Sequence, residues 1–275
     1  MLGRAVVAEG RRRAEAVVAL ARDEVDIRRR DQVLAAARDA APGTIVNCAA
    51  FTAVDACEER RDEAMEVNGT AVGHLVEAAR EVGARLVQVS TDFVFDGASD
   101  RPYTEEDAPA PLSVYGRSKL EGERRAAELP SSLIVRTSWL FGPGGGNFVA
   151  TMARLIATGE TPLRVVDDQV GCPTYTVYLA RALWDLERLR TCGIIHYRNG
   201  APVSWHGFAV RIASLLGDTD GVEAISTKEL ARPAPRPRYS VLDVSRFERL
   251  TRRPVESWEP GLEHYLQQID DGGLS

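Results

Sequence analysis

The sequence predicts an α/β protein: a Rossmann-like, doubly wound parallel sheet followed by a smaller C-terminal domain. The first half alternates short runs rich in valine and isoleucine with segments of helical period, the pattern of a parallel sheet covered by helices. With 275 residues and 44% hydrophobic content, the chain can form one large domain or two closely joined ones with a full core.

The predicted elements of the first half follow in regular order. Strands are expected over residues 16–20, 44–48, 85–90 and 133–137. Helices are expected over residues 30–41, 62–82 and about 115–127. The run 85–90 is apolar enough to be buried on both faces, which places it inside the sheet.

A glycine-rich break at 142–146 marks the point where the chain leaves the sheet. Beyond it the pattern predicts helices near 147–158, 175–189 and 204–216, and strands near 163–166 and 193–197. A proline-arginine loop at 232–238 precedes the closing segment. Because no repeat or low-complexity linker separates the halves, we expect them to pack together.

Charge and composition exclude several functions. The formal charge of −6 and the dispersed arginines argue against nucleic-acid binding. No apolar run approaches the ~18 residues of a membrane span, and the N-terminus lacks a signal-peptide pattern, so we expect a cytoplasmic protein. The four cysteines show no CxxC spacing and the four histidines no metal-binding spacing, so no metal site is predicted.

Tyr115 precedes Lys119 by four residues on a predicted helix. Only two lysines occur among the 34 basic residues, which indicates that Lys119 is needed as lysine. Positions i and i+4 share a helix face about 5–6 Å apart. A cation there favours the phenolate and lowers the phenol pKa, bringing it closer to that of a general acid. Such an acid is required when hydride reduces a carbonyl.

Ser90, Thr91 and Asp92 end a predicted buried strand. At the carboxyl edge of a parallel sheet, a hydroxyl can face a pocket and hydrogen-bond a substrate oxygen. The alternative is a polar strand end that satisfies its own turn.

Four segments then carry a resemblance: STDFVFDG (90–97), PLSVYGRSKLEGE (111–123), RTSWLFGPGGGNFV (136–149) and VVDDQVGCPTYT (165–176). In order and spacing they resemble the dTDP-4-dehydrorhamnose reductases of the extended short-chain dehydrogenase/reductase superfamily. VNCAAFTAVDACE (46–58) and SVLD (240–243) are also similar to that family. The resemblance covers nearly the whole chain and implies a dinucleotide-binding domain over 1–143 with 174–200, and a substrate-binding domain over 144–173 with 201–275.

The resemblance also implies roles for single residues. Tyr115 would donate the proton, Lys119 would lower its pKa and hold the nicotinamide ribose, and Thr91 would bind the reacting carbonyl. Together with Tyr115 and Lys119, the expected cofactor-binding residues are Gly3, Arg22, Asp26, Ile27, Ala49, Ala50, Phe51, Asn68 and Ser90. The expected substrate-binding residues are Thr52, Val54, Thr91, Asp92, Trp139, Asn147 and Arg236.

Several of these positions have a plainer interpretation. Asn68 could be a tolerated polar kink beside Gly69, and Trp139 an ordinary core tryptophan. Arg236 and its neighbours at 232 and 238 suit a diphosphate, but equally suit surface charge in a turn. The segment 167–169 matches the family's DDQ, and we expect it to fix the substrate domain without a catalytic role.

The N-terminus departs from the family pattern. The family begins with a strand and a glycine-rich turn at the cofactor pyrophosphate; here Gly3 aligns with the last of those glycines, and the first strand and glycine-rich loop are missing. The loss would leave two strands without a partner. Either the start was assigned downstream of the true one, or this is a shortened relative with weakened cofactor binding.

The expected cofactor is NADPH, because Arg22 ends the predicted second strand where arginine accommodates a 2′-phosphate. Asp23 follows at once and leaves NADH as the alternative. Asp26 and Ile27 are expected at the adenine. The expected reaction is reduction of the 4-keto group of dTDP-4-dehydro-L-rhamnose or a related dTDP-4-keto-6-deoxysugar. The alternatives are a natural-product deoxysugar 4-ketoreductase and a non-catalytic or regulatory relative; whether the chain forms a homodimer is left open.

Overall fold

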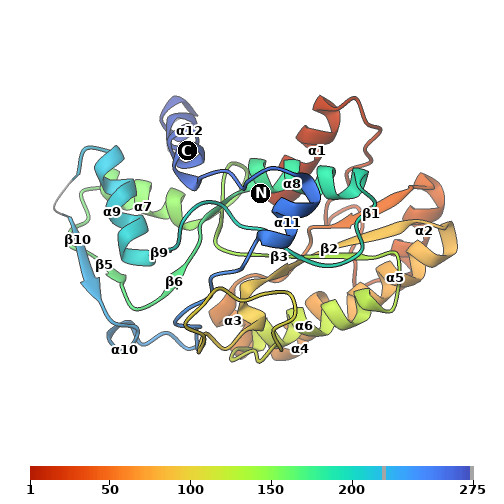
Figure 1. Cartoon of the computed structure of the whole chain (residues 1–275), viewed down its shortest axis with the longest axis horizontal. Coiled ribbons are helices and arrows are strands. Elements are labelled where there is room, and N and C mark those ends of the chain that lie inside the picture. The colour runs from red at the N-terminus through yellow and green to blue at the C-terminus, as the bar shows by residue number, and fades with distance from the viewer. Residues whose placement is uncertain (219–220, 273–275) are drawn as a thin grey trace.

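Four parallel strands form the central sheet of the computed structural model, which describes residues 1–218 and 221–272. They are β1 (Thr44–Asn47), β2 (Arg85–Thr91), β3 (Leu133–Thr137) and β8 (Gly193–His196), in the order β1-β2-β3-β8 (Figure 1). The register places Thr91 beside Thr137 at the carboxyl ends of β2 and β3. The predicted parallel sheet is confirmed.

Helices cover both faces of this sheet (Figure 1). One face carries α1 (Leu2–Arg12), α8 (Thr176–Arg188) and α11 (Ser245–Thr251). The other carries α2 (Arg30–Ala40), α5 (Ala71–Val82) and α6 (Val114–Ala127). Successive strand residues point to opposite faces, so Val87 packs with α8 whereas Leu86 packs with α5. This two-sided burial accounts for the apolar Leu86, Val87 and Val89 and for the burial of every residue of β2.

A second lobe lies at one end of the sheet (Figure 1). It contains α7 (Phe148–Ala157), α9 (Trp205–Leu215), α12 (Trp258–Gly272) and the parallel pair β5 (Leu163–Val166) and β10 (Val222–Ile225). Short pairs join it to the sheet domain: β4 (Leu140–Phe141) with β7 (Thr174–Tyr175), and β6 (Val170–Gly171) with β9 (Val203–Ser204). The helix α10 (Thr227–Leu230) completes it.

The strand predicted over residues 16–20 is wrong, because this segment has no regular structure. Val18 is 66% exposed and Leu20 51% exposed. In the described part of the chain β1 pairs only with β2 and forms the edge of the sheet. A strand requires a neighbour for its backbone groups, and no strand of the described chain lies beside 16–20. The apolar run alone was therefore insufficient.

The helix predicted over 62–82 forms in three parts. They are α4 (Arg61–Met65), the π-helical turn η1 (Glu66–Thr70) and α5. Several elements were not predicted: the helices α1, α3 (Val54–Glu59), α10, α11 and α12, the 3₁₀ turn η2 (Asp92–Val94), and the strands β4, β6, β7, β9 and β10. The other predicted helices and strands form within one or two residues of their expected ends.

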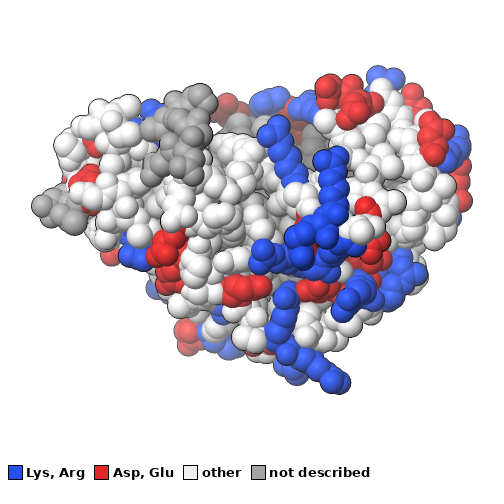
Figure 2. Space-filling model, turned by 90° about the horizontal axis from the view of Figure 1, so that it is seen from above, with Lys and Arg blue, Asp and Glu red and all other residues white. Residues whose placement is uncertain are grey.

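Arginine side chains gather in the middle of the face that carries α1, α8 and α11, with acidic side chains among them (Figure 2). Ion pairs account for part of this pattern: Arg13 of α1 and Arg253 both pair with Asp185 of α8. No helix among residues 1–218 and 221–272 is long and apolar enough to cross a membrane.

Candidate active site

Tyr115 and Thr91 meet where helix α6 begins and strand β2 ends. Ser113 caps the helix by accepting a hydrogen bond from the Gly116 amide at 3.1 Å. This places Tyr115 in the first turn of α6, where its ring lies edge-on to Phe93 with centroids 5.6 Å apart. The phenol lies close to the Thr91 hydroxyl, which acts to lower the phenol pKa.

The Thr91 hydroxyl makes two hydrogen bonds within its own turn. Its hydroxyl donates to Asp92 Oδ1 at 3.0 Å and accepts from the Phe93 amide at 3.2 Å. The hydroxyl therefore satisfies its own turn, as in the plainer of the two interpretations, and its role toward a substrate oxygen stays a prediction. Burial raises the pKa of Asp92 to about 6.

The Tyr115 phenol stays protonated at neutral pH. Burial raises its pKa above the usual value near 10, and the nearby Thr91 hydroxyl acts in the opposite direction. The expected lowering of the pKa by Lys119 is not found. The lysine amine instead donates to the Val89 carbonyl at 2.6 Å. A protonated phenol can nevertheless donate a proton.

Lys119 is almost completely buried, at 3% exposure. Burial lowers its pKa to about 8, and the carboxylate of Glu123 acts against that effect. The lysine follows Tyr115 on the same face of α6. A cation and a phenol therefore lie within one helical turn at the carboxyl edge of the sheet.

Asn68 lies in the π-helical turn η1 and is buried. Its amide accepts from the Phe51 amide at 2.8 Å and donates to the Phe51 carbonyl and to Ser118 Oγ, each at 3.0 Å. These bonds join the turn after β1, with Ala49 and Ala50, to helix α6. Such π-turns are frequent at functional sites, and Asn68 has a defined positioning role, not that of a merely tolerated kink.

The other expected cofactor-binding residues make contacts of their own within the protein. Ser90 directs its hydroxyl to Glu123 Oε1 at 2.5 Å, away from Tyr115, because successive strand residues face opposite ways. Gly3 lies in α1 against Cys48. Arg22 is exposed, and Asp26 pairs with Arg28, which lowers the pKa of Asp26 to about 2.

Trp139 stacks on Trp205 in the second lobe. The ring centroids are 3.6 Å apart and the planes differ by 7°. Trp139 has a positive φ of 46°, and a Cβ on Gly171 would come 2.5 Å from its indole. The half-buried pair makes an aromatic wall, extended by Phe148 against Trp205. Trp205 was not predicted, although it is one of only four tryptophans.

Asn147 and Arg236 have partners within the protein. The Asn147 side chain caps α7 at the Ala150 amide and donates to Tyr265 Oη at 2.9 Å. Arg236 forms a bidentate ion pair with Asp55, from Nη1 to Oδ1 at 3.0 Å and from Nη2 to Oδ2 at 2.9 Å. The geometry thus gives Asn147 a capping role and Arg236 a loop-fixing role. Thr52 is exposed, and Val54 is half-buried beside Phe51.

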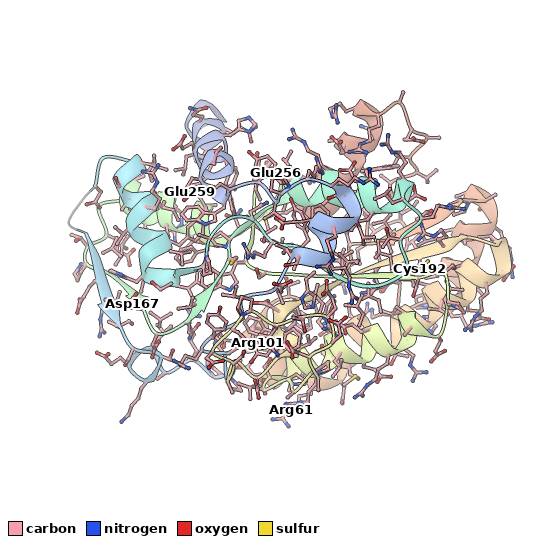
Figure 3. The ribbon with its side chains drawn as sticks, viewed as in Figure 1. Arg61, Arg101, Asp167, Cys192, Glu256 and Glu259 are labelled. Carbon is pink, nitrogen blue, oxygen red and sulfur yellow. The ribbon has the colours of Figure 1, made fainter. Side chains whose placement is uncertain are left out.

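The 167–169 segment fixes the second lobe. Asp167 accepts from Ser204 Oγ at 2.5 Å, Asp168 accepts from the Thr227 amide at 2.9 Å, and Gln169 donates to Thr227 Oγ1. Figure 3 shows Asp167 in that lobe, close to β5 and β6. No group of three or more potential metal-binding side chains occurs in the described ranges 1–218 and 221–272.

A family model described as the RmlD substrate binding domain matches residues 1–270. A dTDP-4-dehydrorhamnose reductase from Streptomyces griseus is 45% identical over 95% of this chain and 88% of its own. The chain belongs to the dTDP-4-dehydrorhamnose reductase family.

Two further reductases are similar to this chain. A dTDP-4-keto-6-deoxy-D-glucose reductase from Streptomyces niveus is 39% identical over 95% of this chain and 92% of its own. The crystal structure of dTDP-4-dehydrorhamnose reductase from Bacillus anthracis str. Ames in complex with NADP has a TM-score of 0.92 and 36% identity, covering 97% of this chain and 95% of that one. The predicted resemblance and Rossmann-like fold are confirmed.

The reductase family implies a dinucleotide, and the residues present fit one. Thr137 of β3 lies beside Thr91 of β2, and its buried Oγ1 has no hydrogen-bond partner among the described residues. The first turn of α1 has no side-chain cap, so its amides can face an anion. Arg22 is exposed and suits a 2′-phosphate.

Proposed function

We propose that this chain is an NADPH-dependent reductase of the 4-keto group of dTDP-4-dehydro-L-rhamnose or a closely related dTDP-4-keto-6-deoxysugar. The observation that carries the proposal is the pairing of a protonated, buried Tyr115 phenol with the Thr91 hydroxyl at the carboxyl edge of a parallel sheet. Lys119 lies one helical turn away. In open α/β sheets this edge is where ligands bind.

Bound NADPH would supply the hydride. The Tyr115 phenol donates a hydrogen bond to the substrate carbonyl oxygen, and the Thr91 hydroxyl does the same once it turns away from Asp92 Oδ1, so that the carbonyl is polarised. As negative charge develops on that oxygen, the Tyr115 phenol donates its proton. The Lys119 amine, one turn further along α6, would hold the nicotinamide ribose of the cofactor.

Other residues shape the two ends of the site. Asn68 fixes the Phe51 main chain, and with it the turn that includes Ala49 and Ala50 and that lines the cofactor. The aromatic wall of Trp139 and Trp205 lies on the substrate side, with Thr52, Val54 and Asp92 nearer the reacting centre. Arg22 supports NADPH over NADH. The cytoplasmic location stays a prediction from the sequence.

The test is a reductase assay on the purified chain with NADPH and dTDP-4-dehydrorhamnose, following the loss of NADPH absorbance. Tyr115→Phe is expected to lower kcat by about 100-fold or more, with NADPH affinity unchanged. Saturable NADPH binding without turnover in the wild-type chain would favour a non-catalytic relative. Full turnover by Tyr115→Phe would overturn the acid assignment.

A sister 4-ketoreductase of natural-product sugars is the second candidate. The similarity to the Streptomyces niveus protein supports it. The two candidates use the same Tyr115 chemistry and differ in the sugar ring. The C4 configuration of the product, measured by NMR on the purified nucleotide sugar, separates them.

A further inference from the structure

A buried chain of hydrogen bonds joins helix α6 to strands β2, β3 and β8, one helical turn beyond Lys119. Ser90 Oγ of β2 donates to Glu123 Oε1 of α6 at 2.5 Å. Arg136 of β3 donates two hydrogen bonds to the same carboxylate, from Nε to Oε1 at 2.9 Å and from Nη2 to Oε2 at 2.7 Å. Three elements of the sheet domain are thereby joined at one carboxylate.

The network continues to strand β8 through a neutral histidine. His196 Nδ1 lies 3.0 Å from the Tyr103 carbonyl, which can only accept, so Nδ1 carries the proton. His196 Nε2 is then free to accept from Arg136 Nη1 at 3.3 Å. Burial, with the nearby Arg136, lowers the pKa of His196 to about 3. Glu123 and Arg136 form the ion pair at the centre of this chain, and Glu105 accepts a hydrogen bond from the His196 amide at 3.0 Å at its far end.

Burial makes this ion pair costly. Glu123 is 3% exposed and Arg136 1% exposed. An apolar pair of similar volume would often stabilise a protein as well, so a buried ion pair is weak evidence for a stabilising role. The position of Glu123 and Arg136 suggests a different one.

The Glu123–Arg136 pair lies next to both Lys119 and Thr91. Glu123 follows Lys119 by one turn on α6, and Ser90 directly precedes Thr91 on β2. The carboxylate favours the charged form of the lysine amine against burial. The other titratable group that influences this amine is the Cys48 thiol, which in turn lies near the N-terminal amine.

We propose that Glu123 and Arg136 are a positioning pair, which fixes α6 against β2 and β3 and thereby places the Lys119 amine at the Val89 carbonyl, one helical turn from Tyr115. This inference rests on the proposed function of Tyr115 and Lys119. Neither residue of the pair touches the substrate. Their effect passes through the lysine and the strand end at Thr91.

The chain allows a direct test, because it contains only two lysines, Lys119 and Lys228. Protein labelled with ¹³C at the lysine ε-carbon should show two resonances, and Lys228→Arg identifies that of Lys119. In Glu123→Gln the titration midpoint of Lys119 should move to lower pH, because an opposite charge has been removed. Glu121→Gln is the matched control on the same helix, since Glu121 pairs with the more exposed Arg125.

Activity supplies the second readout. In Glu123→Gln we expect kcat to fall about 10- to 100-fold, with the KM for NADPH within about twofold of wild type. If Glu123→Gln does not fold, Glu123→Gln with Arg136→Met leaves no unpaired charge and should show the same two changes. Wild-type kcat and an unmoved Lys119 midpoint in a folded variant would overturn the proposal. If the wild-type chain lacks reductase activity, the reductase assignment fails, whereas the Lys119 titration still decides this inference.

Discussion

Gly122 of α6 lies directly against the main chain of Asn68. A Cβ placed on Gly122 would come 2.2 Å from the Asn68 carbonyl oxygen, so no side chain fits there. At the same level, the Asn68 side chain donates to Ser118 of α6. The helix that carries Tyr115 and Lys119 is therefore held against η1 by both a close main-chain approach and a hydrogen bond.

Gly122→Ala should destabilise the protein by about 1–3 kcal/mol, because α6 and η1 would have to separate. Gly73→Ala is the matched control on α5. A Cβ there would come only 3.9 Å from Arg125 Cδ, an ordinary contact. That variant should gain about 0.4–1 kcal/mol from the reduced entropy of the unfolded chain. Urea denaturation measures both, and a Gly122→Ala variant as stable as wild type would contradict the close approach.

Lys119 should make stability depend on alkaline pH. Burial lowers its pKa from 10.5 to about 8, so between these values the unfolded chain binds the extra proton. The contribution of this lysine to stability therefore rises with pH across that window. Lys119→Met removes the cost of the buried charge, on the order of 3 kcal/mol. The stability gain of the variant should be largest below pH ~8 and shrink toward pH ~10.5. Equal gains in urea unfolding at both ends would disprove the pKa direction.

Asp55 and Arg236 should be energetically coupled. Both side chains are partly buried, at 26% and 18% exposure, and the pair is two-pronged. A double-mutant cycle of Asp55→Ala and Arg236→Ala should give a coupling of about 1–2 kcal/mol in the free energy of unfolding. Arg232, 57% exposed and 3.3 Å from the same carboxylate, should couple by less than about 0.5 kcal/mol.

The same variants address the expected role of Arg236 at the diphosphate. If it only fixes the loop, Asp55→Ala and Arg236→Ala should weaken dTDP binding to the same extent, because each breaks the same pair. A larger loss in Arg236→Ala, measured by calorimetry, would show that the guanidinium also binds the nucleotide.

The parts of the structure that the sequence predicts are those set by local pattern. The run 85–90 predicts β2 because Leu86, Val87 and Val89 supply apolar side chains to both faces of the strand. The run at 16–20 has a similar composition and fails, because a strand also needs a neighbour.

The residues of the site also fall into those that local sequence spacing predicts and those that it does not. Tyr115 and Lys119 follow from one helical spacing. Glu123 of helix α6 pairs with Arg136 of strand β3, and Asp55 pairs with a residue 181 positions away, so tertiary packing selects these partners. The spacing from Lys119 to Glu123 on one helix was the available signal for the first of them.

The stack of Trp139 on Trp205 should be visible in solution. Two indoles 3.6 Å apart and nearly parallel couple their electronic transitions, so the circular dichroism spectrum should contain a paired positive and negative band. Trp205→Phe and Trp139→Phe should each abolish it. Trp184→Phe should retain it, because the Trp184 indole donates to the Val6 carbonyl and stacks on no other tryptophan among the described residues. Gly171→Ala should also weaken the band, since its Cβ would displace the Trp139 indole. A band that survives in Trp205→Phe would show that the two indoles are not stacked in solution.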